Sequence, residues 1–218
     1  MKPKAFIFDM NGTMIDDMHY HIVAWYGIFY KYNAAITIEE TKLQVYGKAE
    51  EMFERVFGKG KFSDEQLQGI IIEKELKYQE DFRPYLRLIQ GLEPFIKYAQ
   101  KAGVKLAIGT AASKTNVDYV LDGLQLRGYF DVIVSSDEVA KSKPDPEVFL
   151  KCAELLNISP SQSVVFEDSP QGIEAAFNGG FKAVAITSLF EQEDFAKFGN
   201  LLFSIDDYDA IKLYSLFT

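Results

Sequence analysis

Residues 4–13 read KAFIFDMNGT, and this stretch decides both the fold and the candidate site. Its apolar run from Ala5 to Phe8 is bounded by turn-forming residues, which is typical of a buried strand. The run stops at Asp9, after which Asn11 and Gly12 let the chain turn. In an open parallel sheet, ligands bind at the carboxyl ends of the strands, so we expect Asp9 to face a binding crevice. A lone Asp could equally begin a turn or cap a helix.

From residue 84 onward, predicted helices and strands alternate. The strands are expected at 104–109, 131–134, 163–166 and 181–186, and the helices at 93–102, 115–124, 146–156 and from Ser169-Pro170 to Gly179. Such alternation indicates right-handed β-α-β units that build a parallel sheet. We therefore predict an α/β fold, with a parallel Rossmann-like sheet and helices on both of its faces.

The segment between these parts has a different pattern. Residues 16–32, 37–46, 49–57 and 63–81 have helical spacing of apolar residues, and Ser63 with Gln66 forms a capping-box signature. No strand is expected among them. We predict an all-helical cap at 15–83, inserted into an α/β core made of 1–14 and 84–218. Such a cap would act as a lid over the strand ends.

Composition limits the partners. The 218 residues carry a net charge of −9, so nucleic acid and anionic membranes are disfavoured, and a phosphate-bearing ligand must be held by local cations. The single cysteine, Cys152, lies in a predicted amphipathic helix, where it reads as a small core residue. One cysteine allows no disulfide within the chain, and neither a signal peptide nor a membrane span is recognisable. We expect a cytoplasmic monomer.

Three further strands end in chemically active side chains. The strand at 104–109 leads to Thr110, the strand at 131–134 leads to the loop with Lys143, and the strand at 163–166 leads to Glu167 and Asp168. A carboxylate nucleophile, further carboxylates for Mg²⁺, and a hydroxyl and an ammonium for phosphate oxygens are what phosphoryl transfer requires. Each residue also has a purely structural explanation: Thr110 could be an ordinary strand residue, Lys143 a surface lysine and Asp168 a helix cap. These separate explanations are weaker than one shared site.

These four motifs resemble those of the haloacid dehalogenase superfamily, within its branch of beta-phosphoglucomutase-like phosphatases. They are the residues 9–13, Thr110, Lys143-Pro144 and the residues 166–169, and the resemblance covers essentially the whole chain. It implies that Asp9 is the nucleophile, that Thr110 and Lys143 bind phosphate, and that a small phosphorylated metabolite is the substrate. The implied Mg²⁺ ligands are Asp9, the backbone carbonyl of Asn11, Glu167 and Asp168, and the implied substrate-binding residues next to them are Gly12, Thr13 and Ala111.

Asn11 departs from the pattern of this family, whose phosphatases and mutases have a second aspartate two residues after the nucleophile. That aspartate acts as general acid and then as general base. An amide can hydrogen-bond a leaving-group oxygen, but it cannot give or take a proton at a useful pKa. The sequence therefore predicts an impaired or different activity.

In the first helix of the predicted cap, Asp17, His21 and Trp25 recur every four residues and so share one face. They could be a helix cap, a packing His and a core Trp, or a stripe that contacts substrate. In the family, the positions of His21 and Trp25 lie near the active site, and His21 could replace the missing acid–base group. Lys48 and Lys74 are the candidates for a second phosphate site.

Three functions remain open at this stage. The first is a Mg²⁺-dependent phosphatase of small phosphorylated metabolites that works through an aspartyl phosphate. The second is a phosphomutase, which requires a second phosphate site in the cap. In the mutase branch an arginine binds the remote phosphate just after a Gly like Gly47, and Glu50 stands at about that position here, which favours the phosphatase. The third is a catalytically weak protein that binds a phosphorylated ligand.

Overall fold

The computed structural model describes residues 2–218, which form two compact units. The core unit comprises the residues up to Asp16 together with Arg87–Thr218, and the helical unit comprises Asp17–Leu86. The division expected from the sequence, with a cap at 15–83, lies within a few residues of this one. The chain therefore leaves the core unit just after the Asp9 loop, at Asp16, and returns to it at Arg87, shortly before helix α5 (Leu92–Lys101).

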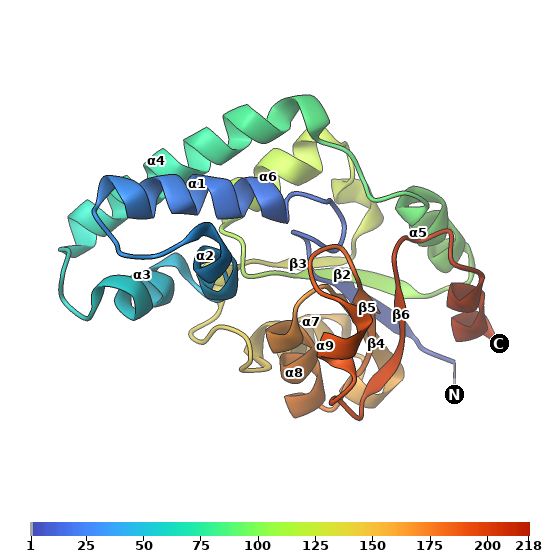
Figure 1. Ribbon diagram of the computed structural model, residues 1–218. Helices are drawn as coiled ribbons and strands as arrows, with labels where there is room; N and C mark the ends of the chain where they lie inside the picture. Colours follow the sequence, from blue (N-terminus) through green and yellow to red (C-terminus); the bar gives the residue numbers. More distant parts are fainter. Residues whose placement is uncertain (1) are drawn as a thin grey trace. The chain divides into compact units, whose positions relative to one another are not determined.

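The core unit is built on a six-stranded parallel sheet (Figure 1). Its strands are β1 (Ala5–Phe8), β2 (Lys105–Gly109), β3 (Val132–Val134), β4 (Ser163–Glu167), β5 (Lys182–Ile186) and β6 (Leu201–Ile205), in the spatial order β3-β2-β1-β4-β5-β6. The predicted α/β fold is confirmed. β6 is the one strand that was not predicted. β1 lies between β2 and β4, so the order in which successive strands are added to the sheet reverses there, and such a switch point is where open α/β sheets bind ligands.

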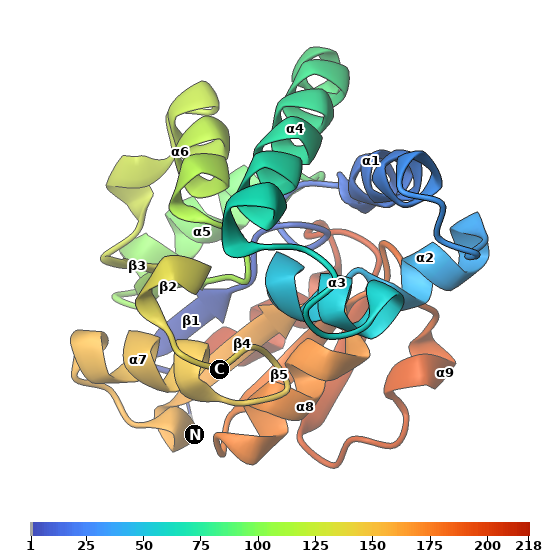
Figure 2. The same cartoon turned by 90° about the vertical axis from the view of Figure 1, so that its left-hand side faces the viewer.

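Helices cover both faces of this sheet. They are α5 (Leu92–Lys101), α6 (Lys114–Gly123), α7 (Glu147–Leu156), α8 (Pro170–Asn178) and the short α9 (Gln192–Phe195), followed by a 3₁₀ segment at Ile211–Phe217. Figure 2 shows α7 and α8 on the near side of the strands and α5 behind them. Alternate strand residues serve the two faces, so that Ile7 and Val165 pack with Phe149 and the buried Cys152 of α7. The core role predicted for Cys152 is confirmed.

The opposite face of the sheet is aromatic. Phe8 of β1 stacks on Phe166 of β4 with 4.6 Å between ring centroids, and Phe6 stacks on Phe95 of α5 at 5.5 Å. Tyr208, which follows β6, lies 6.0 Å from Phe166. Buried aromatic pairs add to the free energy gained by burial of their area, so this cluster fixes the central strands whose ends carry the polar residues.

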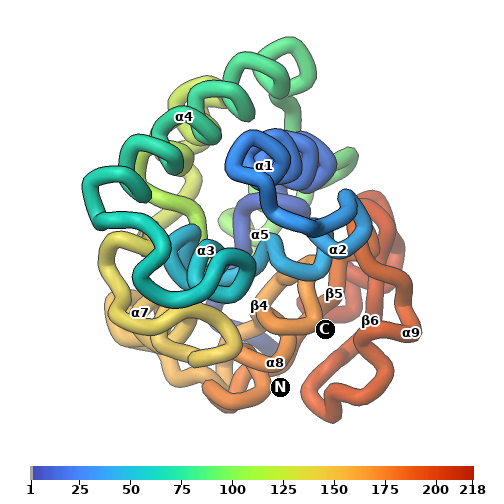
Figure 3. The backbone as a smooth tube through the Cα atoms, turned by 60° about the vertical axis from the view of Figure 1, so that its left-hand side comes forward, coloured from blue at the N-terminus to red at the C-terminus, as the bar shows by residue number. Residues whose placement is uncertain are grey.

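The helical unit consists of α1 (Met18–Lys31), α2 (Ile38–Gln44), α3 (Ala49–Phe57), α4 (Asp64–Phe82) and a 3₁₀ turn at Arg83–Tyr85. Figure 3 shows α1 running beside α4. The helical unit has an apolar core of its own, which includes Trp25, Phe29 and Phe53. The capping box of Ser63 and Gln66 is confirmed at the start of α4. Among residues 2–218, no helix has the length and apolar character needed to cross a bilayer.

The two glycines at the ends of α5 allow a stability prediction. Both have left-handed backbone, with φ of +80° at Gly91 and +77° at Gly103, but a Cβ at Gly91 would come within 2.6 Å of the backbone nitrogen of Asp209, whereas nothing lies within 4 Å at Gly103. We expect Gly103→Ala to cost about 1 kcal/mol of unfolding free energy, and Gly91→Ala to cost clearly more. Urea unfolding of both variants measures this. Equal losses would contradict the close packing of residues 208 and 209 against α5.

Candidate active site

The carboxyl ends of β1 and β4 bring the first polar groups of the site together. Phe8 pairs with Phe166 in the sheet register, and the amide of Asp9 donates to the carbonyl of Phe166 at 2.9 Å. Asp9 therefore continues the ladder beside Glu167. Because this adjacency follows from backbone pairing, the sheet itself places two carboxylates next to each other.

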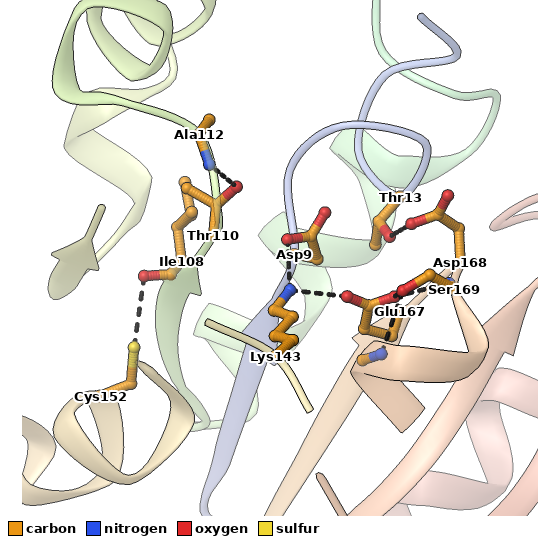
Figure 4. A network of polar contacts seen from close by, with 11 residues as sticks. Asp9, Thr13, Ile108, Thr110, Ala112, Lys143, Cys152, Glu167, Asp168 and Ser169 are labelled. Carbon is orange, nitrogen blue, oxygen red and sulfur yellow. Dashed lines mark hydrogen bonds and ion pairs between the residues drawn. The ribbon is translucent and has the colours of Figure 1, made fainter. Parts of the chain in front are cut away.

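Lys143 joins these carboxylates (Figure 4). Its Nζ donates to Oδ1 of Asp9 and to Oε1 of Glu167, each at 2.6 Å, and the side chain is almost fully buried. Lys143 lies in the loop after β3. In the sheet, β2 separates β3 from β1. The ammonium thus connects three separate segments of the core unit through one buried charged group.

The paired carboxylates after β4 are each oriented by a neighbour. Oε2 of Glu167 accepts from the amide of Ser169 at 2.6 Å and from its hydroxyl at 2.9 Å, while Oδ1 of Asp168 accepts from the hydroxyl of Thr13 at 3.1 Å. Ser169 is also the N-cap of α8, since its Oγ accepts from the amide of Gly172. Helix capping is therefore performed by Ser169, and Asp168 turns towards the Asp9 loop instead.

Thr110 and Ala111 lie where β2 ends. The Thr110 side chain is buried and lowers the pKa of Asp9, which favours the ionised form of that carboxyl. Its Oγ1 also accepts from the amide of Ala112 at 3.1 Å, which fixes the rotamer. The half-buried Ala111 lies between these two residues. The strand-end residues of β1, β2 and β4 and the loop after β3 are thus gathered at one edge of the sheet.

Burial dominates the electrostatics of the cluster. It raises the pKa of Asp9 to about 7, against the opposing effect of the Lys143 ammonium and with a further rise from Glu167. The pKa of Asp168 is raised well above its ordinary value by burial and then by Glu167 and Asp9. For Lys143, burial opposes the charged form, but Asp9 and Glu167 raise its pKa above the usual range. The Lys143 ammonium is therefore charged at neutral pH, and the folded chain opposes full ionisation of the carboxyls around it.

A divalent cation fits this donor set. One oxygen from each of Asp9, Glu167 and Asp168 lies within 4.8 Å of the others, and all three residues are buried. Three carboxylates face one ammonium here, so a divalent cation would balance their charge. Hard oxygen donors from two or three carboxylates suit Mg²⁺, which keeps several waters and takes a phosphate oxygen.

Comparison with known proteins identifies the family of the chain. The model of the haloacid dehalogenase-like hydrolase family matches residues 6–186. The chain belongs to this family. A phosphorylated carbohydrates phosphatase of Thermotoga maritima is 29% identical over 83% of each chain. The fructose-1-phosphate phosphatase of Escherichia coli is 30% identical over 84% of this chain and 96% of its own length.

The fold agrees with that assignment. The crystal structure of a beta-phosphoglucomutase from Clostridium difficile superposes with a TM-score of 0.86 over 99% of this chain and 97% of its own, at 24% identity. This likeness shows the fold. The family named from the four sequence motifs is confirmed, and so is the prediction of a phosphatase-like hydrolase.

The remaining residues predicted on the core unit lie in the loop after β1. Asn11 is half-buried and forms an isolated bridge with Ile15, Gly12 is buried with φ of +71°, and Thr13 is fully buried. The roles expected of the Asn11 carbonyl and of Gly12 stay predictions. In this haloacid dehalogenase-like hydrolase, the loop reaches the carboxylates through the hydrogen bond from Thr13 to Asp168.

In the helical unit, four of the five predicted substrate-binding residues form one buried network. Asp17 does not cap α1 with its side chain but accepts from the hydroxyl of Tyr78 at 2.5 Å. His21 stacks on Tyr78, with Nε2 3.3 Å from Asp17 and Nδ1 2.5 Å from the Nζ of Lys74. The Lys74 ammonium lies 4.8 Å from the Trp25 ring, and burial lowers its pKa.

Lys48, the fifth of these residues, is the N-cap of α3, where its amide donates to Glu51. It is half-buried, whereas Lys74 is 1% exposed and also donates to Glu75. The two lysines proposed for a second phosphate therefore differ in accessibility. Their binding roles stay predictions.

Three residues that contact the site were missed by sequence reasoning. Ser169 was named as a motif residue and as the cap of a predicted helix but not as a site residue, and Ser188 and Tyr208 were not considered. Ser188 donates to the carbonyl of Gly12 at 2.6 Å and Tyr208 donates to the carbonyl of Thr13 at 3.0 Å. Ser188 follows β5, a strand that the sequence predicts, so the strand-end rule would have found it. Tyr208 follows β6, which was not predicted, so the same rule could not have found it.

The raised pKa of Asp9 predicts how metal-free stability changes with pH. The folded value of about 7 exceeds the ordinary 3.8, so the stability linked to the protonated group is complete below pH 3.8 and is lost as the pH rises through 7. Asp168 acts in the same direction. We expect the melting temperature in EDTA to fall between pH 5 and 8, and Mg²⁺ to raise it most at pH 8.

Thermal melts at several pH values, with EDTA or with Mg²⁺, test this expectation. Asp9→Asn is the matched control, because the amide does not ionise, so the metal-free profile should become flatter and keep only the part due to Asp168. A wild-type profile in EDTA as flat as that of the variant would show that Asp9 does not titrate in this range.

Proposed function

We propose that this haloacid dehalogenase-like hydrolase transfers the phosphoryl group of small phosphorylated sugars to Asp9, in a Mg²⁺-dependent reaction. The observation that carries the proposal is the buried cluster in which Lys143 lies 2.6 Å from both Asp9 and Glu167, beside Asp168. The sugar class is supported by the names of the relatives from Thermotoga maritima and Escherichia coli.

Asp9 is the group placed for nucleophilic attack. A carboxylate oxygen of Asp9 forms the new P–O bond while the bond from phosphorus to the sugar oxygen breaks, which leaves an aspartyl phosphate and an alkoxide that must take up a proton. Water then attacks the phosphorus, inorganic phosphate leaves, and the Asp9 carboxylate is regenerated. Lys143 donates to Asp9, and Thr110 ends the neighbouring strand β2; both are placed to balance charge on the transferring oxygens.

Asp9, Glu167 and Asp168, with the Asn11 carbonyl, would hold Mg²⁺. When bound, the ion would offset the negative charge of the nucleophile and of the phosphate. The protein residues orient this set in advance, because Ser169 holds Glu167 and Thr13 holds Asp168. Pre-organised donors act without rearrangement during the reaction, and this is where most of their benefit arises.

Asn11 limits the two halves of the reaction unequally. Attack on a donor with a stable leaving group, such as an acyl phosphate or a nitrophenyl ester, needs little protonation. Departure of a sugar alkoxide needs an acid, and hydrolysis of the aspartyl phosphate needs a base, and an amide supplies neither. The chain should therefore accept phosphate from activated donors faster than it releases it.

Asp9→Asn tests the nucleophile. We expect it to abolish phosphoryl transfer from 4-nitrophenyl phosphate and from acetyl phosphate, because an amide oxygen is a poor nucleophile towards phosphorus. The measurement combines release of nitrophenolate with intact-mass detection of the phosphorylated protein. Asp16→Asn is the control, since Asp16 is exposed and lies seven residues away in sequence. Substantial transfer by Asp9→Asn would remove Asp9 from its role.

Asn11→Asp tests the missing acid–base group. General acid–base assistance is typically worth about 10²–10⁴-fold, so we expect turnover of a sugar phosphate panel to rise by a factor in that range. The affinity for Mg²⁺ should change little if the metal contact of residue 11 is its backbone carbonyl. Steady-state phosphate release and calorimetric Mg²⁺ titration measure the two quantities.

The control for Asn11→Asp is fresh wild-type protein verified by intact mass, because an Asn-Gly sequence can deamidate and create the same side chain. Equal turnover of the verified wild type and the variant would show that another group moves the proton. His21→Ala would then be the next variant to assay.

A further inference from the structure

Two hydroxyl groups from the end of the chain hold consecutive peptide carbonyls of the Asp9 loop. Ser188 donates to the carbonyl of Gly12 at 2.6 Å, and Tyr208 donates to the carbonyl of Thr13 at 3.0 Å. Both donors lie C-terminal to the residues that match the family model, and all these residues belong to the core unit. The contacts join segments that are 176 and 195 residues apart in the chain.

These contacts fix the peptide planes on both sides of Thr13. A trans peptide is planar, with its N–H and C=O on opposite sides, so holding both groups fixes the orientation of the plane. In the first plane, the Gly12 carbonyl accepts from Ser188 and the Thr13 amide donates to the carbonyl of Met10 at 3.3 Å. In the second, the Thr13 carbonyl accepts from Tyr208, and the Met14 amide donates to the same Met10 carbonyl at 2.8 Å.

Fixed planes on both sides leave Thr13 one backbone conformation, and this directs its side chain. The Thr13 hydroxyl donates to Oδ1 of Asp168 at 3.1 Å. Asp168 is one of the three carboxylates whose oxygens lie within 4.8 Å of each other. The position of this carboxylate is therefore set through a chain of contacts that begins at Ser188 and Tyr208.

Tyr208 is itself held rigidly. It is 2% exposed, with its ring centroid 5.7 Å from that of Phe95 and 6.3 Å from that of Phe8. Its amide donates to the carbonyl of Gln90 at 2.9 Å. Burial, followed by the charges of Asp168 and Asp9, raises the pKa of Tyr208 well above its usual value, so the phenol remains a neutral donor.

Ser188 is anchored through its neighbour. The amide of Thr187 donates to the carbonyl of Ile205 at 2.9 Å, and the Thr187 hydroxyl donates to Asp206 at 2.5 Å. The loops after β5 and β6 are thereby tied together. The two hydroxyl donors act from one braced structure and not from two independent loops.

We propose that Ser188 and Tyr208 are positioning residues of the active site, which orient Thr13 and, through it, the Asp168 carboxylate. The inference rests on the proposed function, because it assigns Asp168 to the Mg²⁺ site. Neither hydroxyl is proposed to contact substrate or metal. Their role is to keep a metal-binding carboxylate in the geometry that the reaction uses.

The test measures Mg²⁺ affinity by calorimetry in the absence of any substrate. Tyr208→Phe removes the hydroxyl but retains the ring that packs on Phe8 and Phe95, and Ser188→Ala removes the other donor. Each should weaken Mg²⁺ binding by about two- to tenfold, the amount of one ordinary hydrogen bond. The controls are Tyr214→Phe and Ser215→Ala, matched exchanges in the final 3₁₀ segment, which should bind like the wild type.

A double-variant cycle separates positioning from general loosening of the fold. Thr13→Val removes the hydroxyl that reaches Asp168, so Tyr208→Phe should have little further effect on Mg²⁺ affinity in that background. Multiplied effects, or single variants with wild-type affinity, would overturn the inference alone. A wild type that does not bind Mg²⁺ would overturn the proposed function as well.

Discussion

The site depends on one buried ammonium. Lys143 lies between Asp9 and Glu167, at 2.6 Å from each, and without it two adjacent carboxylates would lie buried with no opposite charge beside them. Breaking such a buried arrangement on one side typically costs about 3–5 kcal/mol, because it leaves an uncompensated charge. The same contact fastens the loop after β3 to the two central strands. Charge balance and loop placement are therefore achieved by a single side chain.

The excess negative charge of this cluster links folding to ligand binding. Burial raises the pKa values of Asp9 and Asp168, which means that the folded chain resists their ionisation. A site that must be ionised to work is thus destabilising until a cation arrives, and binding of that cation then adds to stability. The aromatic stacking of Phe8 on Phe166 lies directly behind the two carboxylate-bearing strand ends and helps to hold them meanwhile.

Sequence reasoning found the residues whose position follows from the sheet. Asp9, Thr110 and Asp168 each follow an apolar run, and parallel strands bring such ends to one edge whatever the connections between them. It missed Tyr208, because its bond to Thr13 joins residues 195 apart and has no local periodic signal. The burial of Lys74 was equally invisible, since it arises from the pairing of α1 with α4. β6 lies at the edge of the sheet and was not predicted as a strand, which hid Tyr208 as well.

The loop after β1 explains how an amide can stand at residue 11 without loss of the site. Its backbone is held by the Met10 carbonyl, by Ser188 and by Tyr208, and none of these contacts uses the side chain of Asn11. Exchange between amide and carboxylate at this position therefore leaves these three backbone contacts of the loop in place. What an amide at residue 11 removes is proton transfer, which belongs to the reaction and not to the fold.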